Sequence, residues 1–124
     1  MIREIGLREL EDIATGAAVL GTGGGGDPHV GKLMAIQAIE ECGPVRLVSV
    51  DEVPDDALIM PLAMMGAPTV LVEKIPNGEE VLRAYEALRS YLGKEVYATM
   101  PIEAGGVNSM IPLASAARLG IPVI

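Results

Sequence analysis

Apolar residues recur at steps of three and four in several stretches of the chain, which is the spacing of one face of an α-helix. One such stretch predicts an opening helix that ends at Gly21, from the apolar positions Leu10, Ile13, Ala17 and Leu20. A second helix is predicted to begin at Pro28, with Asp27 as its N-cap, and to stop at the Gly-Pro pair of residues 43–44. Its apolar positions are Val30, Leu33, Met34, Ile36 and Ile39.

Further along the chain, continuous apolar runs alternate with helical patterns. Asn77 begins the clearest helix, in which Glu80 is placed to complete a capping-box-like start and Gly93 marks the end. Glu79 and Arg83 are expected to form an i,i+4 ion pair on its exposed side. Strands are predicted at residues 45–50, 57–62 and 96–100, a helix at residues 109–119, and the start of a fourth strand at residues 121–124.

This alternation predicts an α/β fold with a mostly parallel sheet, because short apolar runs without alternation fit buried parallel strands. Residues 1–124 are enough for one domain. Residues 120–124 resemble the beginning of a buried strand whose far end would normally lead into a functional loop. We therefore interpret the chain as a single domain that forms the N-terminal part of a larger protein.

Composition narrows the classes of function. The net charge is −8 and the nine Lys and Arg residues form no cluster, which excludes the basic surface that nucleic-acid binding requires. No apolar run has the length of a membrane span, and the N-terminus lacks the pattern of a signal peptide. The single cysteine, Cys42, allows no internal disulfide. These features predict a cytoplasmic protein that binds neither nucleic acid nor membrane.

The glycine run of residues 21–26 matches two nucleotide-binding templates in part. It contains G-x-G-x-x-G, and Asp51 could imitate the acidic ribose ligand of a dinucleotide fold, but the run follows a helical pattern instead of a strand. Residues 26–33 have the frame of a P-loop, yet Leu33 replaces the hydroxyl that binds magnesium, and Asp27 and Pro28 lie inside the cradle. The P-loop is excluded, and a dinucleotide site remains a minor alternative.

A more general interpretation of the glycine run concerns its backbone. Successive glycines before a capped helix leave N–H groups free at the positive end of the helix dipole, where a carboxylate, phosphate or polarised carbonyl can bind. The alternative is a flexible or tightly packed turn without a ligand. The residues predicted to bind substrate here are Gly23, Gly24, Gly25, Gly26 and Asp27.

A second group of candidate residues follows the strand predicted at residues 96–100. Glu103 and Asn108 lie beyond the carboxyl end of that strand, where ligands bind in parallel sheets. The carboxylate is a candidate metal ligand or general base and the amide a candidate hydrogen-bond donor, with Gly105 and Gly106 between them. The alternative is that Asn108 or Ser109 is an ordinary helix cap and Glu103 a solvated loop residue.

Other residues are less specific candidates for the site. Thr69, after the turn of Met64-Met65-Gly66-Ala67-Pro68, either caps a helix or contacts substrate, and Glu73 either acts in the site or pairs with Lys74 on the surface. His29 is a candidate acid, base or ligand close to the glycine run, although a lone histidine is more often structural. Cys42 is expected to be a small apolar residue at a helix end.

Three blocks together resemble the N-terminal domain of the S-methyl thiohydantoin desulfurase-like family. They are residues 20–28 (LGTGGGGDP), residues 65–69 (MGAPT) followed by Glu73-Lys74, and residues 101–108 (PIEAGGVN). The resemblance covers nearly the whole chain. It implies a three-layer α/β/α domain, followed in the complete protein by a mostly β domain that this sequence lacks.

The resemblance also implies a function related to the hydantoinase and oxoprolinase pathways. The expected activity is a metal-assisted hydrolase or desulfurase that removes sulfur from a thiohydantoin or related cyclic amide, with zinc or another divalent metal whose ligands lie partly outside this chain. Glu103 would handle protons or hold the metal, while Asn108 and the glycine-run amides would stabilise negative charge. A non-catalytic small-molecule-binding or assembly subunit is the alternative. A homo-oligomer, or a partner β domain, is expected.

Overall fold

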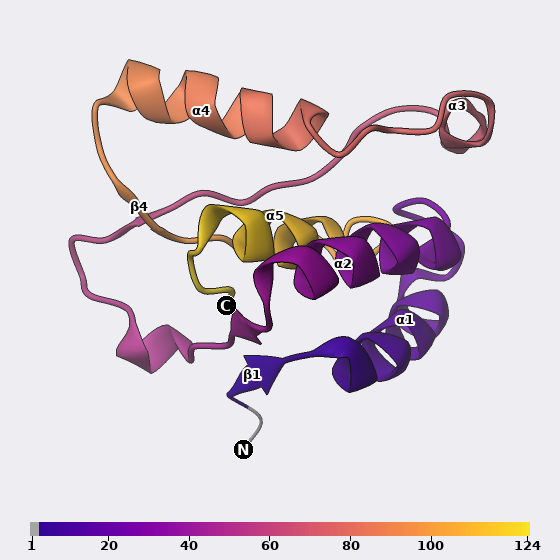
Figure 1. The fold of residues 1–124 in the computed structure, drawn as a ribbon, viewed down its shortest axis with the longest axis horizontal. Helices are drawn as coiled ribbons and strands as arrows, with labels where there is room; N and C mark the ends of the chain where they lie inside the picture. The colour runs from indigo at the N-terminus through magenta and orange to yellow at the C-terminus, as the bar shows by residue number, and fades with distance from the viewer. Residues whose placement is uncertain (1–2) are drawn as a thin grey trace.

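The computed structural model describes residues 3–124. Helices dominate and the strands are short (Figure 1). In chain order the elements are β1 (Glu4–Ile5), α1 (Leu7–Gly21), α2 (Pro28–Cys42), β2 (Val45–Arg46), the 3-10 helix η1 (Val50–Glu52), β3 (Leu58–Ile59), α3 (Pro68–Glu73), α4 (Glu80–Leu92), β4 (Val96–Ala98) and α5 (Ile111–Leu119).

The strands form two small sheets. β1 pairs antiparallel with β2, and β3 pairs in parallel with β4. The last residues of the chain lie between these two pairs, because Val123 makes parallel bridges to Leu47 on one side and to Thr99 on the other. The Val48 N–H donates to the Val123 carbonyl at 2.9 Å, and the Thr99 N–H donates to the Pro122 carbonyl at 3.0 Å.

The structure confirms a mixed α/β fold in which most strand contacts are parallel. The strands are shorter than predicted, and β1 was not predicted at all. The first predicted strand, residues 45–50, is reduced to β2, and its last residue, Val50, begins η1 instead. The Ser49 hydroxyl accepts the Asp51 N–H and the Glu52 carboxylate accepts the Ser49 N–H. Ser and Glu three residues apart make such a capping box, which competes with an extended backbone.

The helices lie where the pattern predicts them, although α4 begins at Glu80, three residues after the predicted start at Asn77. α2 begins at Pro28 with Asp27 as its N-cap, as predicted, and α4 ends at Gly93 in a left-handed conformation. The predicted helix over residues 109–119 begins two residues late, at Ile111. Pro112 explains this start, because proline lacks an N–H and fits only in the first turn of a helix. No helix was predicted at α3, except in the alternative that Thr69 caps one.

Two connected groups of buried side chains hold these elements together. One joins α1, α2 and α5 to β1, β2 and Val123, and it includes the fully buried Leu10 and Met110. The other joins α4 to the segment after β3 and to α5, through Val81, Tyr85, Met60 and Ile111 among others. α2 and α5 pack closely because α2 presents small residues, Gly31, Ala35 and Ala38, on this side. The second group places the segment after β3 against the start of α5.

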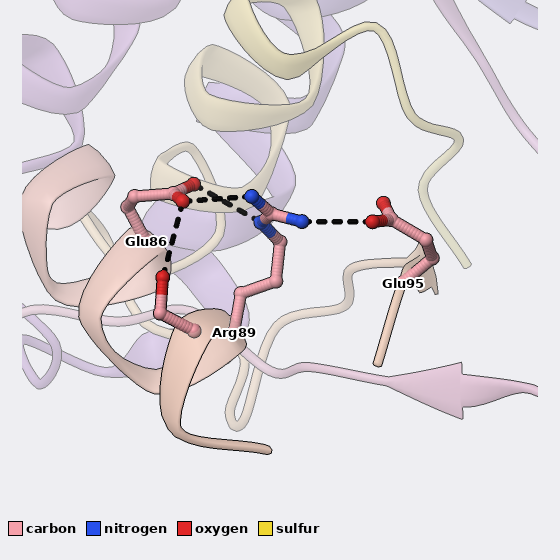
Figure 2. Close-up of polar contacts among 4 residues, drawn as sticks. Glu86, Arg89 and Glu95 are labelled. Atoms are coloured by element: carbon pink, nitrogen blue, oxygen red, sulfur yellow. Dashed lines mark hydrogen bonds and ion pairs between the residues drawn. The ribbon is translucent and has the colours of Figure 1, made fainter. Parts of the chain in front are cut away.

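Exposed ion pairs lie on the surface of α4. Figure 2 shows the Arg89 guanidinium between the Glu86 and Glu95 carboxylates. Arg89 nitrogens lie 2.8 Å from an oxygen of each carboxylate, and the Ser90 hydroxyl donates to Glu86. The hydrogen bond from Arg89, followed by its positive charge, lowers the pKa of Glu86. The predicted i,i+4 pair of Glu79 and Arg83 is present at 2.6 Å. No helix within residues 3–124 combines the length and the apolar character of a membrane span.

Candidate functional site

Three loops meet around an open pocket of about 370 Å³. They are the glycine loop (residues 22–27) between α1 and α2, the Met64 segment (residues 63–67) between β3 and α3, and the Glu103 loop (residues 101–109) between β4 and α5. α3 completes the wall. The pocket is lined by Gly25, Gly26, Met64, Met65, Gly66, Ala67, Pro68, Val70, Leu71, Ile102, Glu103, Val107 and Asn108. Parts of all three sequence blocks therefore reach one site.

The glycine loop binds the Glu103 loop through its carbonyl groups. The Gly24 carbonyl accepts the Gly106 N–H at 3.1 Å, and the Gly25 carbonyl accepts the N–H groups of Val107 and Asn108 at 2.7 and 3.1 Å. This arrangement differs from the predicted one, in which the loop served only as a set of free N–H donors. The two loops instead form one hydrogen-bonded unit.

Close backbone contact explains why both loops contain glycine. A Cβ atom added to Gly105 would lie 2.6 Å from the Gly25 Cα, and one on Gly26 would lie 2.7 Å from the Val107 Cγ2. Gly25 and Gly26 also have φ angles of 69° and 87°, which disfavour residues with a side chain. A Cβ on Gly106 would overlap the Gly26 carbonyl. The tightly packed turn, considered as an alternative to a ligand site, is therefore present.

The glycine loop nevertheless contributes to the pocket. Gly25 and Gly26 line it, and across residues 3–124 their N–H groups donate no hydrogen bond. Gly23, Gly24 and Asp27 do not line it. The Gly24 N–H donates to the Gly21 carbonyl at 2.8 Å, and the Asp27 carboxylate caps α2 by accepting the His29 N–H at 2.8 Å.

Glu103 and Asn108 are in direct contact. The Asn108 Nδ2 donates to the Glu103 Oε1 at 2.8 Å and to the Met64 carbonyl at 3.1 Å, and the Asn108 Oδ1 accepts the Met64 N–H at 2.8 Å. Asn108 is 5 % exposed, whereas Glu103 is exposed. The alternative of a helix cap at Asn108 or Ser109 is wrong, because α5 begins at Ile111 with Met110 at its N-cap position. The exposure of Glu103 agrees with the other part of that alternative, a solvated loop residue.

The bonds of Asn108 change its expected role. A primary amide has two N–H donors, and both are engaged here with protein acceptors. In this arrangement Asn108 has no donor left for the negative charge of a ligand, which was its predicted function. Glu103 retains its second oxygen, Oε2, which accepts no hydrogen bond in the part of the chain that the structure describes.

The remaining predicted residues lie around the pocket without lining it. Thr69 is exposed in the first turn of α3, whose N-cap residue is Ala67, so Thr69 does not cap this helix. Gly105 and Gly106 are buried where the Glu103 loop packs against the glycine loop. The predicted surface pair of Glu73 and Lys74 is not among the ion pairs formed within residues 3–124.

Most of the apolar wall of the pocket was not predicted from the sequence. Val70 and Leu71 of α3, together with Ile102 and Val107 of the Glu103 loop, line the pocket beside Met64. The sequence signal was limited to their position next to the glycine and proline turns. Their side-chain types resemble those of any core residue, so only the fold distinguishes them.

Nothing in this pocket forms a metal centre by itself. Within the described residues, no three His, Cys, Asp or Glu side chains lie close enough together to hold a metal ion. Glu103 is the one acidic residue of the pocket wall, and His29 and Cys42 are both exposed. A metal bound by protein side chains usually needs three or four ligands, so residues 3–124 by themselves do not fit such a group.

The dinucleotide alternative also lacks its structural context. The glycine loop follows α1, whereas the fingerprint requires a strand before the glycines. Its carbonyl groups are occupied by the Glu103 loop, and Asp51 lies in η1. These features leave the pocket lined by Glu103 as the candidate site.

Comparisons with known proteins identify the family of this domain. Residues 8–124 match the family model of the S-Me-THD-like N-terminal domain. A crystal structure of a protein from Chromobacterium violaceum is similar, with a TM-score of 0.79 and 30% identity over 98% of this chain. The chain spans 34% of that longer protein. No curated protein matches the chain significantly. The chain belongs to the S-Me-THD-like family, whose N-terminal domain it matches over nearly its whole length.

Proposed function

We propose that this chain is the N-terminal domain of a cytoplasmic hydrolase or desulfurase that acts on a thiohydantoin or a related five-membered cyclic amide. The observation that carries the proposal is the Glu103 carboxylate, held by the buried Asn108 at the wall of a mostly apolar pocket. The pocket volume of about 370 Å³ is within the range of small-molecule sites. Membership of the S-Me-THD-like family supports the choice of substrate class.

Glu103 acts in this proposal as a general base and then as a general acid. It accepts one proton from a water molecule whose oxygen bonds to the ring carbon that carries the S-methyl group. It then donates this proton to the sulfur as the C–S bond breaks. The second water proton moves to the ring nitrogen, so the products are a ring carbonyl and methanethiol. Gly25 and Gly26 line the pocket, and in this proposal their N–H groups bind the ring atom on which negative charge develops.

The complete protein is proposed to supply the rest of the site. The chain covers about one third of the structurally similar protein, and its pocket contains a single carboxylate. We keep the three-layer α/β/α arrangement as a proposal for this domain, and assign the β domain and most ligands of any divalent metal, such as zinc, to the rest of the complete protein. Glu103 is the one ligand that this pocket offers to such a metal. A second copy of the chain is the alternative source of the missing groups.

The direct test replaces Glu103 with Gln in the complete protein that contains this domain. Glutamine keeps an oxygen that accepts the Asn108 N–H, so the loops remain in place, but it cannot exchange a proton. Release of methanethiol from an S-methyl thiohydantoin is expected to stop. Glu73→Gln is the matched control, because Glu73 is exposed on α3 and does not line the pocket. Normal turnover by Glu103→Gln would remove this residue from the mechanism.

A non-catalytic binding subunit is the second candidate. It is favoured by the absence of a metal-binding cluster within residues 3–124 and by the single carboxylate of the pocket. In that case, hydantoin would perturb the amide signals of Gly25, Gly26 and Glu103 in NMR spectra, while the complete protein would show no turnover. The dinucleotide alternative predicts that NAD raises the melting temperature.

A further inference from the structure

We propose that Asn108 is a positioning residue, which orients Glu103 and joins two walls of the pocket without contacting the ligand. This inference rests on the proposed function of Glu103. It follows from the three hydrogen bonds of one side-chain amide, which reach Glu103 within its own loop and Met64, 44 residues earlier in the chain.

The hydrogen bonds of Asn108 leave it little freedom to rotate. A rotation of 180° about the last side-chain bond would place the NH2 group against the Met64 N–H and the oxygen against the Met64 carbonyl. Donor would then face donor and acceptor would face acceptor. Because the residue is 5 % exposed, water cannot readily replace the lost bonds. The amide is thus fixed with one N–H directed at Glu103.

Two glycines restrict the Glu103 carboxylate from another direction. A Cβ atom on Gly105 would lie 2.9 Å from the Glu103 Oε1, and one on Gly25 would lie 3.0 Å from it. The oxygen therefore occupies space that a side chain at either position would fill. Together with the bond from Asn108, this contact holds Oε1 in place, and Oε2 remains as the oxygen that is free to act on a ligand.

The same amide couples the Met64 segment to the Glu103 loop. Both backbone polar groups of Met64 bind Asn108, and Met64 lines the pocket together with Glu103. Within residues 3–124 no other hydrogen bond joins these two loops, and the nearest one, from the Leu62 N–H to the Met100 carbonyl, lies just before both of them. Loss of the amide is therefore expected to disturb the distance from Glu103 to the opposite wall.

The test compares Asn108→Asp with Asn77→Asp in the complete protein, with an S-methyl thiohydantoin as the substrate. Aspartate at 108 can still accept the Met64 N–H but cannot donate to Glu103, and it places a second negative charge beside it. We expect kcat to fall about 100-fold, the size typical of a misplaced catalytic group, while KM changes by less than about threefold. Asn77 is an exposed asparagine whose oxygen accepts the Glu79 N–H, a bond that aspartate keeps, so both constants should be unchanged.

An NMR measurement on this chain tests the same inference without activity. The two side-chain N–H signals of Asn108 are expected to shift in Glu103→Ala, because one of them loses its acceptor. They should exchange slowly with solvent, and saturation with S-methyl thiohydantoin should move them less than it moves the Gly25 and Gly26 amides. Rapid exchange of the Asn108 side-chain N–H groups with solvent, or signals that do not shift in Glu103→Ala, would overturn the inference.

The outcomes separate this inference from the proposed function. Loss of turnover in Glu103→Gln, combined with a raised KM and an unchanged kcat in Asn108→Asp, would retain the function and make Asn108 a ligand-binding residue. Full turnover in Glu103→Gln would overturn the proposed role of Glu103. A shift of the Asn108 signals in Glu103→Ala would then still establish the contact, but the positioning role in catalysis would be wrong.

Discussion

Gly105 lies with its backbone against that of Gly25, so that a Cβ atom on Gly105 would come within 2.6 Å of the Gly25 Cα. The two residues belong to loops that are about eighty positions apart in the chain. Their contact allows the Gly25 carbonyl to accept two N–H groups of the Glu103 loop. The glycines thus allow two backbones to approach, and the same approach brings Glu103 to the pocket.

Replacement of Gly105 with Ala is expected to separate the two loops. The added methyl group meets backbone atoms of Gly25 that cannot move without breaking hydrogen bonds, and overpacking of this kind costs about 1–3 kcal/mol of unfolding free energy. Chemical denaturation followed by circular dichroism measures this loss. Glycine at position 105 would be dispensable if the variant were as stable as the native chain.

Gly16→Ala is the matched control for this prediction. Gly16 lies inside α1, and a Cβ atom there would meet nothing within 4 Å. Alanine favours the helix over glycine by about 1 kcal/mol, so this variant should be more stable than the native chain. The opposite signs of the two glycine substitutions would distinguish a packing requirement from a general preference for glycine.

Replacement of Asp27 with Ala is expected to destabilise α2. The Asp27 carboxylate accepts the His29 N–H at 2.8 Å, and loss of such an N-cap costs about 1 kcal/mol. Asp27→Ser should retain most of the stability, because serine also caps helices. Thermal unfolding of the three proteins provides the comparison. A serine variant as unstable as the alanine variant would mean that the negative charge, and not capping, is what α2 requires.

Glu80 is expected to make stability depend on pH. Its own N–H, followed by that of Asn77, binds the carboxylate and lowers the pKa of Glu80 in the folded protein. A lowered folded pKa adds stability above the pKa of the unfolded chain, and this stability disappears as the pH falls through the folded value. Glu80→Gln should therefore be less stable than the native chain near about pH 7, with the difference shrinking in acid.

Urea denaturation at several pH values measures this dependence. Asp55→Asn serves as the control, since Asp55 is exposed and makes no hydrogen bond or ion pair within the described part of the chain. Its stability difference from the native chain should not follow the same pH course. A Glu80→Gln difference that stayed constant from neutral to acidic pH would contradict the proposed linkage.

The ion pairs of Arg89 are expected to contribute little. Arg89 bridges Glu86 and Glu95 at the surface (Figure 2), where water and salt screen the charges. Glu95→Gln should shift the denaturation midpoint only slightly at low salt and not at all near about 1 M salt. The hydrogen bonds of Glu86 should persist in the variant. A large shift that survives high salt would show that this network stabilises the fold.

Local sequence rules predicted the helices well and the strands poorly. Asp27, Pro28 and Gly93 act within one or two residues of themselves, so the ends of α2 and α4 were predictable from them. Strands depend on a partner distant in sequence. Residues 121–124 lie between Leu47 and Thr99, an arrangement that no local pattern indicates. Val50, the last residue of a predicted strand, lies in η1 instead, because the Ser49 capping box stabilises that helical turn.

The sequence by itself determined which residue types were available for a site: a glycine run before a capped helix, and a carboxylate and an amide five positions apart. It also indicated the family. The tertiary structure decided how they are used. It directed the glycine carbonyls to the Glu103 loop, committed both N–H groups of Asn108 to Met64 and Glu103, and left one Glu103 oxygen free. The reason is physical: hydrogen bonds and close backbone contacts between loops depend on distances in space, which spacing along the chain does not specify.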